Sequence, residues 1–348
     1  MTDSPKRQQS ARSPRKLPLI RYQRIMLMVL LGLAPATLAA VYFFGLRVLA
    51  LLAISSAVGL FVEWLFCRPQ REPVSMAVFV TTVLLALVVP PTLPLWMIAL
   101  GSAFAVAFGK MVFGGFGRNV FNPALVGRCF IFVCFPVAMT AGAAWVQPMI
   151  APPAGLTRWS APDAVTGATP MLARKMTMRA GQPAEISGVR YRDLLVGNRA
   201  GSTGETFALA LIAGGIFLLV TRTASWQIVL SCLLAHGALA SALHYSGVSG
   251  APDPLFSLLS GGFLLGLFFM ATDPVSAPSQ ATSKWIYGAG IGALTIVIRV
   301  FSIFSGGMMF AILLMNMFAP ITDWCVRAWR TGAKPAPATQ AQASAPDS

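Results

Sequence analysis

The chain has 348 residues, of which 56% are hydrophobic and only 11% are charged. Soluble domains carry about 25% charged residues, so this composition excludes an ordinary soluble protein and favours a membrane protein with several spans. The net charge of +15 is concentrated in the tails and connections, where membrane topology explains it. Because the sequence contains no DNA- or RNA-reading motif, we expect no nucleic acid among its partners.

Residues 1–24 form the first predicted element, a basic arm ahead of the first apolar segment. An arm rich in Lys and Arg is expected to be disordered and to stay in the cytoplasm. The next apolar segment has full membrane length and lacks a convincing cleavage site, so the arm is not predicted to be a cleavable signal.

Ten apolar segments follow, each close to the length of a membrane-spanning helix. A long polar connection, residues 147–204, separates the first five segments (25–146) from the last five (205–325), and residues 326–348 are expected to form a disordered cytoplasmic tail. Because each half has an odd number of segments, the halves are predicted to have opposite orientations. We therefore expect an all-α polytopic membrane protein with about ten transmembrane helices in two inverted five-helix halves. The segments are 25–45, 48–66, 74–90, 92–112, 121–146, 205–221, 226–246, 254–271, 284–304 and 307–325.

The distribution of Lys and Arg predicts the orientation, because cytoplasmic connections are enriched in these residues. Basic residues follow the second, fourth, sixth and eighth segments, which places both termini in the cytoplasm. The 147–204 connection then lies on the outer face of the membrane. Loops of this length cross the membrane largely regardless of charge, although this one carries Arg158, Arg174, Lys175, Arg179, Arg190, Arg192 and Arg199.

Corresponding polar interruptions occur in the fifth and tenth segments. Asn122 is followed by Pro123 in the first half, and Asn316 precedes Pro320 in the second. Such residues free backbone groups that protein, water or a ligand must satisfy. Two readings stay open at this point: broken helices beside a cofactor or ion path, and ordinary kinks.

Four carboxylates lie in or beside the apolar segments, where ionisable residues are candidates for function. Glu63 is close enough in sequence to pair with Arg68, and Glu205 begins the sixth segment, where a carboxylate favours the helix dipole. Asp273 precedes a proline, so helix termination competes with ion binding as its role, and Asp323 is the fourth acid. We favour structural roles for these acids. The alternative, an ion or electron path, uses Asn122, Asn316, Glu205 and Asp273.

The histidines and cysteines exclude several kinds of site. His236 and His244 lie on one predicted helix and no other histidine exists, so haem held by two histidines of this chain is excluded. The five cysteines form no CxxC pair and are expected to be free, buried thiols. The chain also lacks a Ser-His-Asp arrangement, a dinucleotide-binding glycine motif and a phosphate loop. We predict no metal site and no catalytic residue.

The segment 163–170, Asp-Ala-Val-Thr-Gly-Ala-Thr-Pro, stands out within the long connection. The proline disfavours a helical backbone at Thr169, and the Gly-Ala pair before this threonine adds little bulk beside its hydroxyl. A bulky partner can therefore reach this hydroxyl. Taken alone, the segment is typical of a turn that enters a short helix, with Thr166 or Thr169 as the cap.

Thr-Gly-Ala-Thr, preceded by Asp163, also resembles the acceptor motif for covalent flavin attachment in the Rnf and Nqr respiratory complexes. The resemblance extends over roughly residues 24–325. The stretches "TDPVSAP" and "LLMNMFAP" are more similar to the Rnf protein RnfD than to its Nqr counterpart NqrB, whereas the turn at 302–307 departs from the family pattern. The matching stretches are 114–124, 204–206, 269–278 and 313–320.

The resemblance implies FMN joined through its phosphate to Thr169 by a flavin transferase, which makes the chain a phosphoprotein. The implied cofactor-binding residues are Asp163, Thr166, Gly167, Ala168, Thr169 and Pro170. A second, non-covalent flavin is a further expectation.

The implied function is that of an electron-carrying membrane subunit in an ion-translocating ferredoxin:NAD oxidoreductase of the Rnf type, coupled to Na⁺ or H⁺ transport. Alternatives are the NqrB protein of an Nqr-type quinone reductase, a solute permease with similar inverted repeats, and a structural scaffold. Implied partners are the other Rnf subunits, including a second flavin-bearing subunit, and membrane lipid. Those other subunits are expected to bind NAD and ferredoxin.

Overall fold

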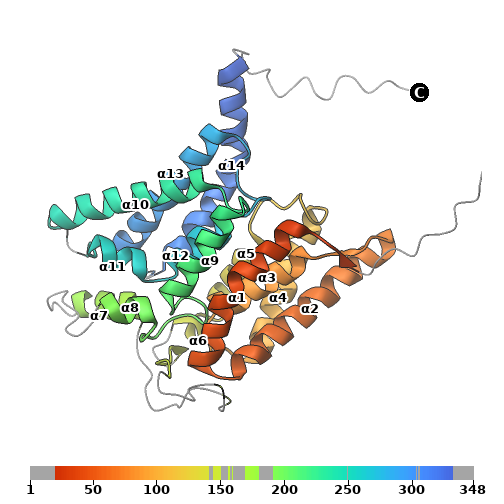
Figure 1. The fold of residues 1–348 in the computed structure, drawn as a ribbon, viewed down its shortest axis with the longest axis horizontal. Helices are drawn as coiled ribbons and strands as arrows, with labels where there is room; N and C mark the ends of the chain where they lie inside the picture. Colours follow the sequence, from red (N-terminus) through yellow and green to blue (C-terminus); the bar gives the residue numbers. More distant parts are fainter. Residues whose placement is uncertain are drawn as a thin grey trace, which may run out of the picture.

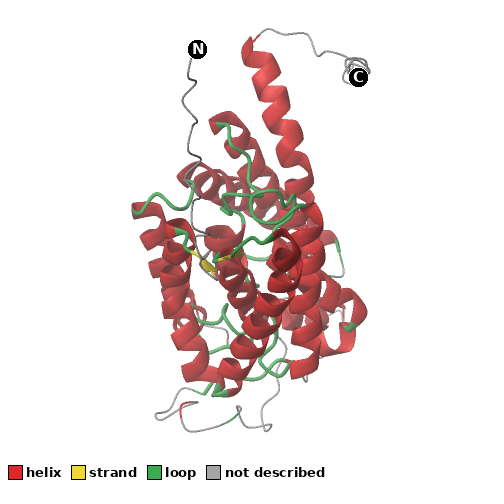
Figure 2. Cartoon of the chain, turned by 90° about the vertical axis from the view of Figure 1, so that its right-hand side faces the viewer, coloured by secondary structure: helices red, strands yellow, loops and turns green. Residues whose placement is uncertain are grey.

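The computed structural model describes residues 20–140, 144–149, 156, 159, 169–179, 191–248, 250–302, 304 and 306–331. Within these ranges the chain is mostly helical (Figure 1). The sheet found there is a short parallel pair, β1 (Ile20–Arg21) with β2 (Val74–Ser75), which appears as a small patch of strand among the helices in Figure 2. The predicted all-α class is confirmed.

The helices follow the predicted segments along the chain. The first half contains α1 (Arg24–Phe44), α2 (Arg47–Gln70), α3 (Ala77–Val88), α4 (Leu95–Gly109), the 3₁₀ turn η1 (Met111–Phe113), α5 (Pro123–Cys134) and α6 (Pro136–Thr140). The long connection contains α7 (Pro170–Arg179) and α8 (Tyr191–Val196). The second half contains α9 (Ala208–Val220), α10 (Trp226–Tyr245), α11 (Pro254–Leu259), α12 (Phe263–Leu265), the π-helical turn η4 (Gly266–Met270), α13 (Ala281–Phe301) and α14 (Met308–Thr331).

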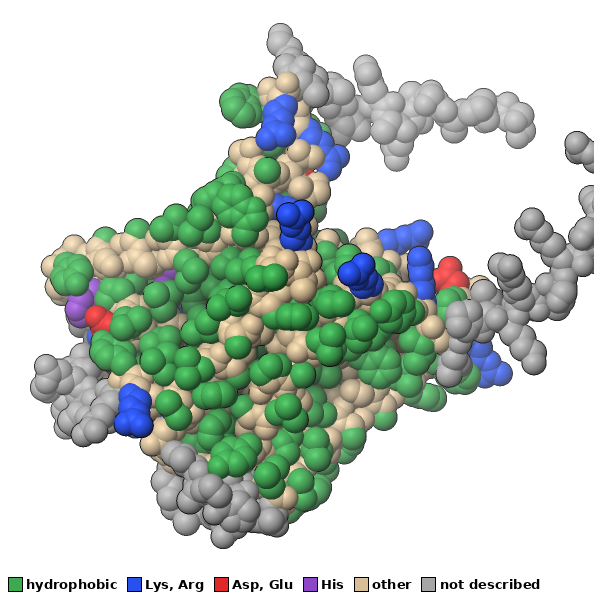
Figure 3. Space-filling model, in the orientation of Figure 1, with side chains coloured by type: hydrophobic (Ala, Val, Ile, Leu, Met, Phe, Trp, Pro, Cys, Tyr) green, Lys and Arg blue, Asp and Glu red, His purple; other side chains and the backbone are tan. Residues whose placement is uncertain are grey.

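Length and hydropathy make this a multi-pass membrane protein. Among the described residues, six helical segments are long and apolar enough to cross a membrane: α1, α2, α4 with η1, α10, α13 and α14. Three shorter apolar helices, α3, α5 and α9, accompany them. Large apolar side chains such as Leu38, Phe61 and Val133 are exposed on the bundle, and hydrophobic side chains cover much of the face in Figure 3. Lipid or neighbouring subunits are the expected surroundings of such a surface.

Two of the ten predicted segments are interrupted, so ten continuous helices are not what the structure shows. The fifth segment divides at Phe135 into α5 and α6, because Pro136 cannot donate the backbone hydrogen bond that would continue the helix. In the eighth segment, α11 ends at Leu259 and α12 begins at Phe263. Between them the backbones of Gly261 and Gly262 are left-handed, with φ of +66° and +67°, a conformation that glycine adopts readily.

The two halves repeat one packing pattern. In the first half α4 packs against α2 and α5, and in the second half α13 packs against α10 and α14. The halves meet where α1 packs on α9. There a Cβ added to Gly214 would lie 2.1 Å from the Gly32 carbonyl oxygen, so the two backbones approach too closely for a side chain at this point. A buried apolar core extends through both halves, and the C-terminal part of α14 projects beyond it (Figure 1).

Candidate functional site

Thr169 is the N-terminal cap of α7. Its Oγ1 accepts a hydrogen bond from the Leu172 backbone N–H at 3.2 Å, and its carbonyl accepts one from the Ala173 N–H at 2.8 Å. Pro170 occupies the first helical position, where its missing N–H costs nothing. The capping role predicted for Thr166 or Thr169 is thus confirmed for Thr169. The other predicted binding residues, Asp163, Thr166, Gly167 and Ala168, lie outside the described residues.

Thr169 also lines a cavity of about 390 Å³, a size typical of small-molecule and cofactor sites. This Thr169 cavity lies between α5, α6, α7 and the start of α14. Its lining combines aromatic rings with a few polar groups: Phe132, Trp145, Phe304 and Phe310 on one hand, and Arg128, Lys175, Glu205 and Thr140 on the other. Thr169 itself is only 8% exposed, so its hydroxyl is less accessible to a bulky partner than the sequence predicted.

Two basic side chains hold α7 in place beside the cavity. The Nη2 of Arg174 donates to the Ala251 carbonyl at 2.6 Å, and the Nζ of Lys175 donates to the carbonyls of Ser302 and Phe304 at 2.7 and 2.5 Å. Burial lowers the pKa of the Arg174 guanidinium, and the nearby Asp253 carboxylate opposes this effect. These bonds tie α7 to the connection between α10 and α11 and to the connection between α13 and α14. The wall containing Thr169 is therefore fixed by tertiary contacts.

Aromatic rings form the opposite wall. The ring centroids of Phe132, Phe304 and Phe310 lie 5.0 to 5.9 Å from one another. Edge and tilted contacts of this kind are favourable beyond simple area burial. The rings are inclined to one another by 41° to 81°, and together they give the cavity an apolar, aromatic wall.

Arg128 brings a positive charge into the same cavity from the apolar helix α5. Its Nε is buried and has no hydrogen-bond partner among the residues that the structure describes. Glu205 is within electrostatic reach, but its Oε1 is bonded to the Ser202 N–H at 3.0 Å. Glu205 precedes α9 and lines the cavity, instead of beginning the sixth helix as predicted. Arg128 therefore adds a positive charge to the lining of the cavity.

At the centre of the molecule the structure joins the two asparagines that the sequence placed in equivalent positions. The Oδ1 of Asn316 accepts the backbone N–H of Asn122 at 3.2 Å, and both side chains are buried. Asn122 caps α5 and donates to the Met270 carbonyl at 3.4 Å, and Asn316 donates to the Tyr287 hydroxyl at 2.7 Å. Asn122 is thus at a helix start, whereas Asn316 lies within the continuous helix α14.

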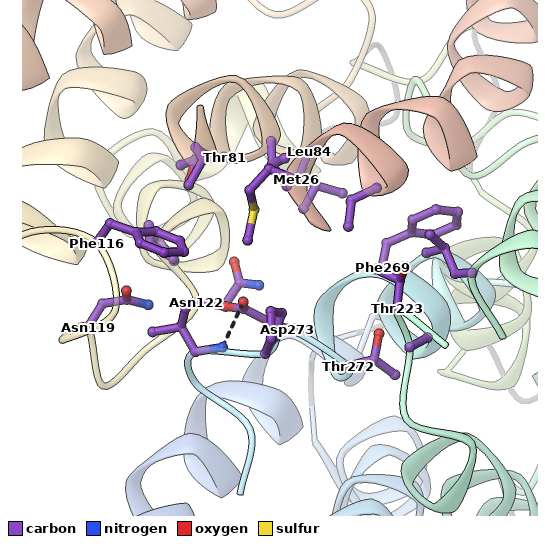
Figure 4. Close-up of a pocket in the computed structure, with 18 of the residues that line it drawn as sticks. Met26, Thr81, Leu84, Phe116, Asn119, Asn122, Thr223, Phe269, Thr272 and Asp273 are labelled. Carbon is purple, nitrogen blue, oxygen red and sulfur yellow. Dashed lines mark hydrogen bonds between the residues drawn. The ribbon is translucent and has the colours of Figure 1, made fainter. Parts of the chain in front are cut away.

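A second, narrower cavity of about 50 Å³ lies on the other side of this asparagine pair. Asn119, Asn122, Thr272 and Asp273 line it (Figure 4). Asp273 accepts the Val275 N–H at 3.2 Å and the Ser276 hydroxyl at 2.9 Å. It therefore closes a turn after η4, as expected, while also bordering a cavity.

The remaining predicted acids have structural partners. Glu63 does not pair with Arg68, so that prediction is wrong: its Oε2 lies 2.6 Å from the Lys110 Nζ, because packing of α2 on α4 brings the two together. Asp323 accepts the N–H groups of Ser279 and Gln280 and so anchors the start of α13.

The histidines and cysteines fit the predictions in part. His236 contacts Ser257, and His244 contacts the Ala251 carbonyl. All five cysteines are free, but only Cys67 and Cys232 are fully buried, and Cys134 and Cys325 are exposed.

Arg128 was not among the residues predicted from the sequence. A lone arginine inside an apolar helix is a functional candidate by default, so the signal was present.

Comparison with known proteins identifies the family. A sequence model of the NQR2, RnfD, RnfE family matches residues 11–332. The chain belongs to this family. It is 41% identical over 279 residues to the B subunit of the Na(+)-translocating NADH-quinone reductase of Ectopseudomonas mendocina, a match that covers 78% of this chain and 64% of the relative. It is 42% identical over 275 residues to the protein of the same name in Pseudomonas aeruginosa, covering 76% and 63%, and 40% identical over 276 residues to that of Haemophilus influenzae, covering 76% and 62%.

The chain thus spans less than two thirds of the length of these curated relatives. Family membership confirms the resemblance drawn from the motifs. It associates the chain with electron transport and with ion transport across a membrane. The names of these relatives favour the Nqr-type alternative over the Rnf-type reading of the motifs.

Proposed function

We propose that this chain is a flavin-carrying membrane subunit of an ion-translocating electron transport complex, with FMN joined by a phosphoester to Thr169. The observation that carries the proposal is the surroundings of the Thr169 hydroxyl. It faces a cavity of suitable size whose lining includes Arg128, with a buried Nε that has no hydrogen-bond partner among the described residues, and an aromatic wall. FMN supplies redox chemistry through its isoalloxazine ring, and the chain's residues bind and orient it.

The residues fit the two ends of FMN. Its phosphate would lie at the N-terminus of α7, where helix N–H groups and the dipole favour an anion. Arg128 and Lys175, which line the same cavity, add positive charge. The apolar ring system would contact the wall formed by Phe132, Phe304 and Phe310.

Capping and esterification at Thr169 are compatible. Oγ1 uses a lone pair to accept the Leu172 N–H, and esterification replaces only the hydroxyl proton. The oxygen therefore stays in the cap, and Thr169 acts as a tether rather than as a nucleophile during turnover.

Intact-mass analysis after co-expression with a flavin transferase tests this assignment. The wild-type chain is expected to gain the mass of esterified FMN, and Thr169→Ala to gain none while still inserting into the membrane, since loss of one hydroxyl opens no large cavity. Thr166→Ala is expected to reduce labelling less. Thr140→Ala is the matched control, because Thr140 lines the same cavity and bonds only the Pro136 carbonyl. Equal adduct in wild type and Thr169→Ala would overturn the site.

The electron donor and acceptor distinguish two versions of the proposal. The NADH-quinone reductase version is favoured by the names of the relatives, and the ferredoxin:NAD version by the 272–278 and 313–320 stretches. Both require other subunits, including a second flavin-bearing one, and a flavin transferase. Reduction of the Thr169 flavin in membranes by NADH and its reoxidation by quinone, against reduction by reduced ferredoxin and reoxidation by NAD, decides between them. A permease without flavin would show neither.

The asparagine pair and the two acids Glu205 and Asp273 are the candidate ion or electron path. A cavity of about 10 Å³ shares Glu205 with the Thr169 cavity and is also lined by Met270, whose carbonyl is bonded to Asn122. Asn122 and Asp273 border the second cavity. Na⁺ or H⁺ as the coupled ion remains a prediction, as does a second, non-covalent flavin, for which the sequence indicates no residues.

The orientation is the remaining part of the proposal. Positive charges on the even-numbered connections place both termini in the cytoplasm and Thr169 on the periplasmic side of the inner membrane. Cysteine substitutions at Ser187 and Ser344, both outside the described residues, test this in intact cells lacking the native cysteines. A membrane-impermeant thiol reagent is expected to label position 187 only. Labelling of position 344 alone would show that the orientation is the reverse of the one proposed.

A further inference from the structure

Arg299, on α13, holds the break between α11 and α12. Its side chain is 1% exposed and donates to the carbonyls of Ser257, Ser260 and Gly261 at 2.5, 2.9 and 3.0 Å. These carbonyls have lost their helical partners because α11 ends at Leu259. Unsatisfied backbone groups are costly in a membrane interior, so the guanidinium stabilises a broken helix that would otherwise be unfavourable.

A second helix supports the same break. The Nε2 of His236, on α10, lies 3.0 Å from the Ser257 hydroxyl, and Arg299 Nη1 donates to that hydroxyl at 3.0 Å. The Phe263 ring lies against both, 4.2 Å from the His236 ring and 5.8 Å from the Arg299 guanidinium carbon. His236, Ser257 and Arg299, here called the Arg299 cluster, therefore fix the start of the eighth segment from two sides.

The glycine turn at the break fits between Arg299 and Glu205. A Cβ added to Gly261 would lie 2.9 Å from Arg299 Nη2, and one added to Gly262 would lie 2.6 Å from Glu205 Oε2. Glu205 and Arg299 also interact electrostatically. Both Gly261 and Glu205 line the Thr169 cavity. The Glu205 carboxylate thus lies directly beside a turn that Arg299 holds.

The first half has the same arrangement with different side chains. Glu63 on α2, Ser75 just before α3 and Lys110 just after α4 form a buried cluster, here called the Glu63 cluster. In both halves a side chain of the second segment, a serine near the start of the third and a cation late in the fourth meet. Lys110 borders the second cavity, as Arg299 supports a wall of the first. Recurrence at equivalent positions indicates that such a cluster positions a cavity wall.

We propose that Arg299 is a positioning residue that sets the reduction potential of the flavin on Thr169. It holds the Gly261–Gly262 turn beside Glu205, and its positive charge offsets the carboxylate and favours electron uptake by the flavin. This inference rests on the proposed function, because it requires flavin at Thr169. At an effective dielectric constant of about 20, a unit charge that is near a redox group but not in contact with it shifts the reduction equilibrium by roughly tenfold.

The test is a redox titration of the flavinylated full-length chain in detergent, monitored by flavin absorbance, with loading measured by mass. Arg299→Gln is expected to disfavour reduction by about tenfold, equivalent to about 59 mV for one electron. Arg299→Lys keeps the charge and is expected to retain most of the wild-type potential. Thr295→Val is the matched control, since Thr295 is equally buried on α13 and bonds the Ile291 carbonyl of its own helix.

Glu205→Gln provides an independent arm if Arg299→Gln fails to fold. It removes the opposite charge and is expected to favour reduction by a similar factor. A fully loaded Arg299→Gln protein with the wild-type potential would overturn the proposal, as would an unchanged potential in Glu205→Gln. Absence of flavin from the wild-type chain is a different result, seen by mass alone, and would refute the proposed function itself.

Discussion

Replacement of Glu63 by Gln is expected to destabilise the first half severely. The carboxylate contacts Lys110 Nζ at 2.6 Å and accepts the Ser75 N–H and hydroxyl at 2.9 and 2.7 Å, and both charged side chains are 2% exposed. Gln would leave the Lys110 ammonium buried without a counter-charge. Removing one partner of a buried ion pair costs about 3–5 kcal/mol. The double variant Glu63→Gln/Lys110→Met removes both charges, so it is expected to be more stable than Glu63→Gln by at least about 1 kcal/mol.

Cys67 provides the assay for this prediction. It lies one turn after Glu63 on α2 and is buried, so a thiol reagent reaches it only when this region opens. With the other four cysteines replaced, the labelling rate in detergent reports the opening equilibrium. A loss of about 3–5 kcal/mol corresponds to an increase of roughly 10²-fold to 5 × 10³-fold in that rate. Glu72→Gln, which removes an exposed carboxylate nearby, is the matched control.

Two results would refute the reasoning. Labelling of Glu63→Gln within about threefold of the Glu72→Gln control would show that the buried pair contributes little. Labelling of the double variant as fast as that of Glu63→Gln would show that the stranded Lys110 charge is not the cause.

Two further predictions concern the centre of the molecule and the connection before α11. Replacing Asn122 or Asn316 by Leu is expected to lower the free energy of unfolding by about 1–3 kcal/mol, because buried hydrogen-bond partners are left unsatisfied. The same variants are expected to impair electron transfer or ion coupling while Thr169 stays flavinylated. Wild-type rates of electron transfer and of ion transport would show that the pair serves helix packing alone. Burial raises the pKa of Asp253, but hydrogen bonds from the Phe256 N–H and the Tyr191 hydroxyl outweigh this effect and leave the pKa below its ordinary value. The stabilisation from Asp253 is therefore complete above about pH 3.9, the unfolded value, and is lost as the pH falls through the lower folded pKa; amide exchange at Phe256 should accelerate there in wild type and show no such step in Asp253→Asn.

The sequence predicted the long helices well, because length and continuous hydropathy are sufficient for a membrane-spanning helix. It did not predict the break in the eighth segment. Membrane helices tolerate glycine, so Gly261 and Gly262 gave no clear stop signal. What ends α11 there is a set of tertiary bonds from Arg299, which lies 38 residues after Gly261 in the chain.

Contacts between distant residues account for the other differences. Glu63 was assigned to Arg68 because that cation is near in sequence, but helix packing delivers Lys110, 47 residues away, to the same carboxylate. Thr169 was predicted as the attachment residue from a local sequence motif. Its cavity, by contrast, is assembled from α5, α6, α7 and α14, and no single stretch of sequence encodes it.

The capping position of Thr169 has a consequence for the order of events in biogenesis. Its hydroxyl oxygen is enclosed once α7 has docked, so a transferase of protein size has access only before docking or after α7 swings away. A helix of ten residues is only marginally stable in isolation, so the Thr169 hydroxyl is expected to stay accessible to the transferase early in synthesis. If Thr169 is the acceptor, flavin attachment precedes the docking of α7. The attached ring system then becomes part of the surface against which the start of α14 packs. Slowing the docking of α7, for example by Arg174→Ala, should therefore raise the rate of flavinylation rather than lower it, as measured by the time course of adduct mass.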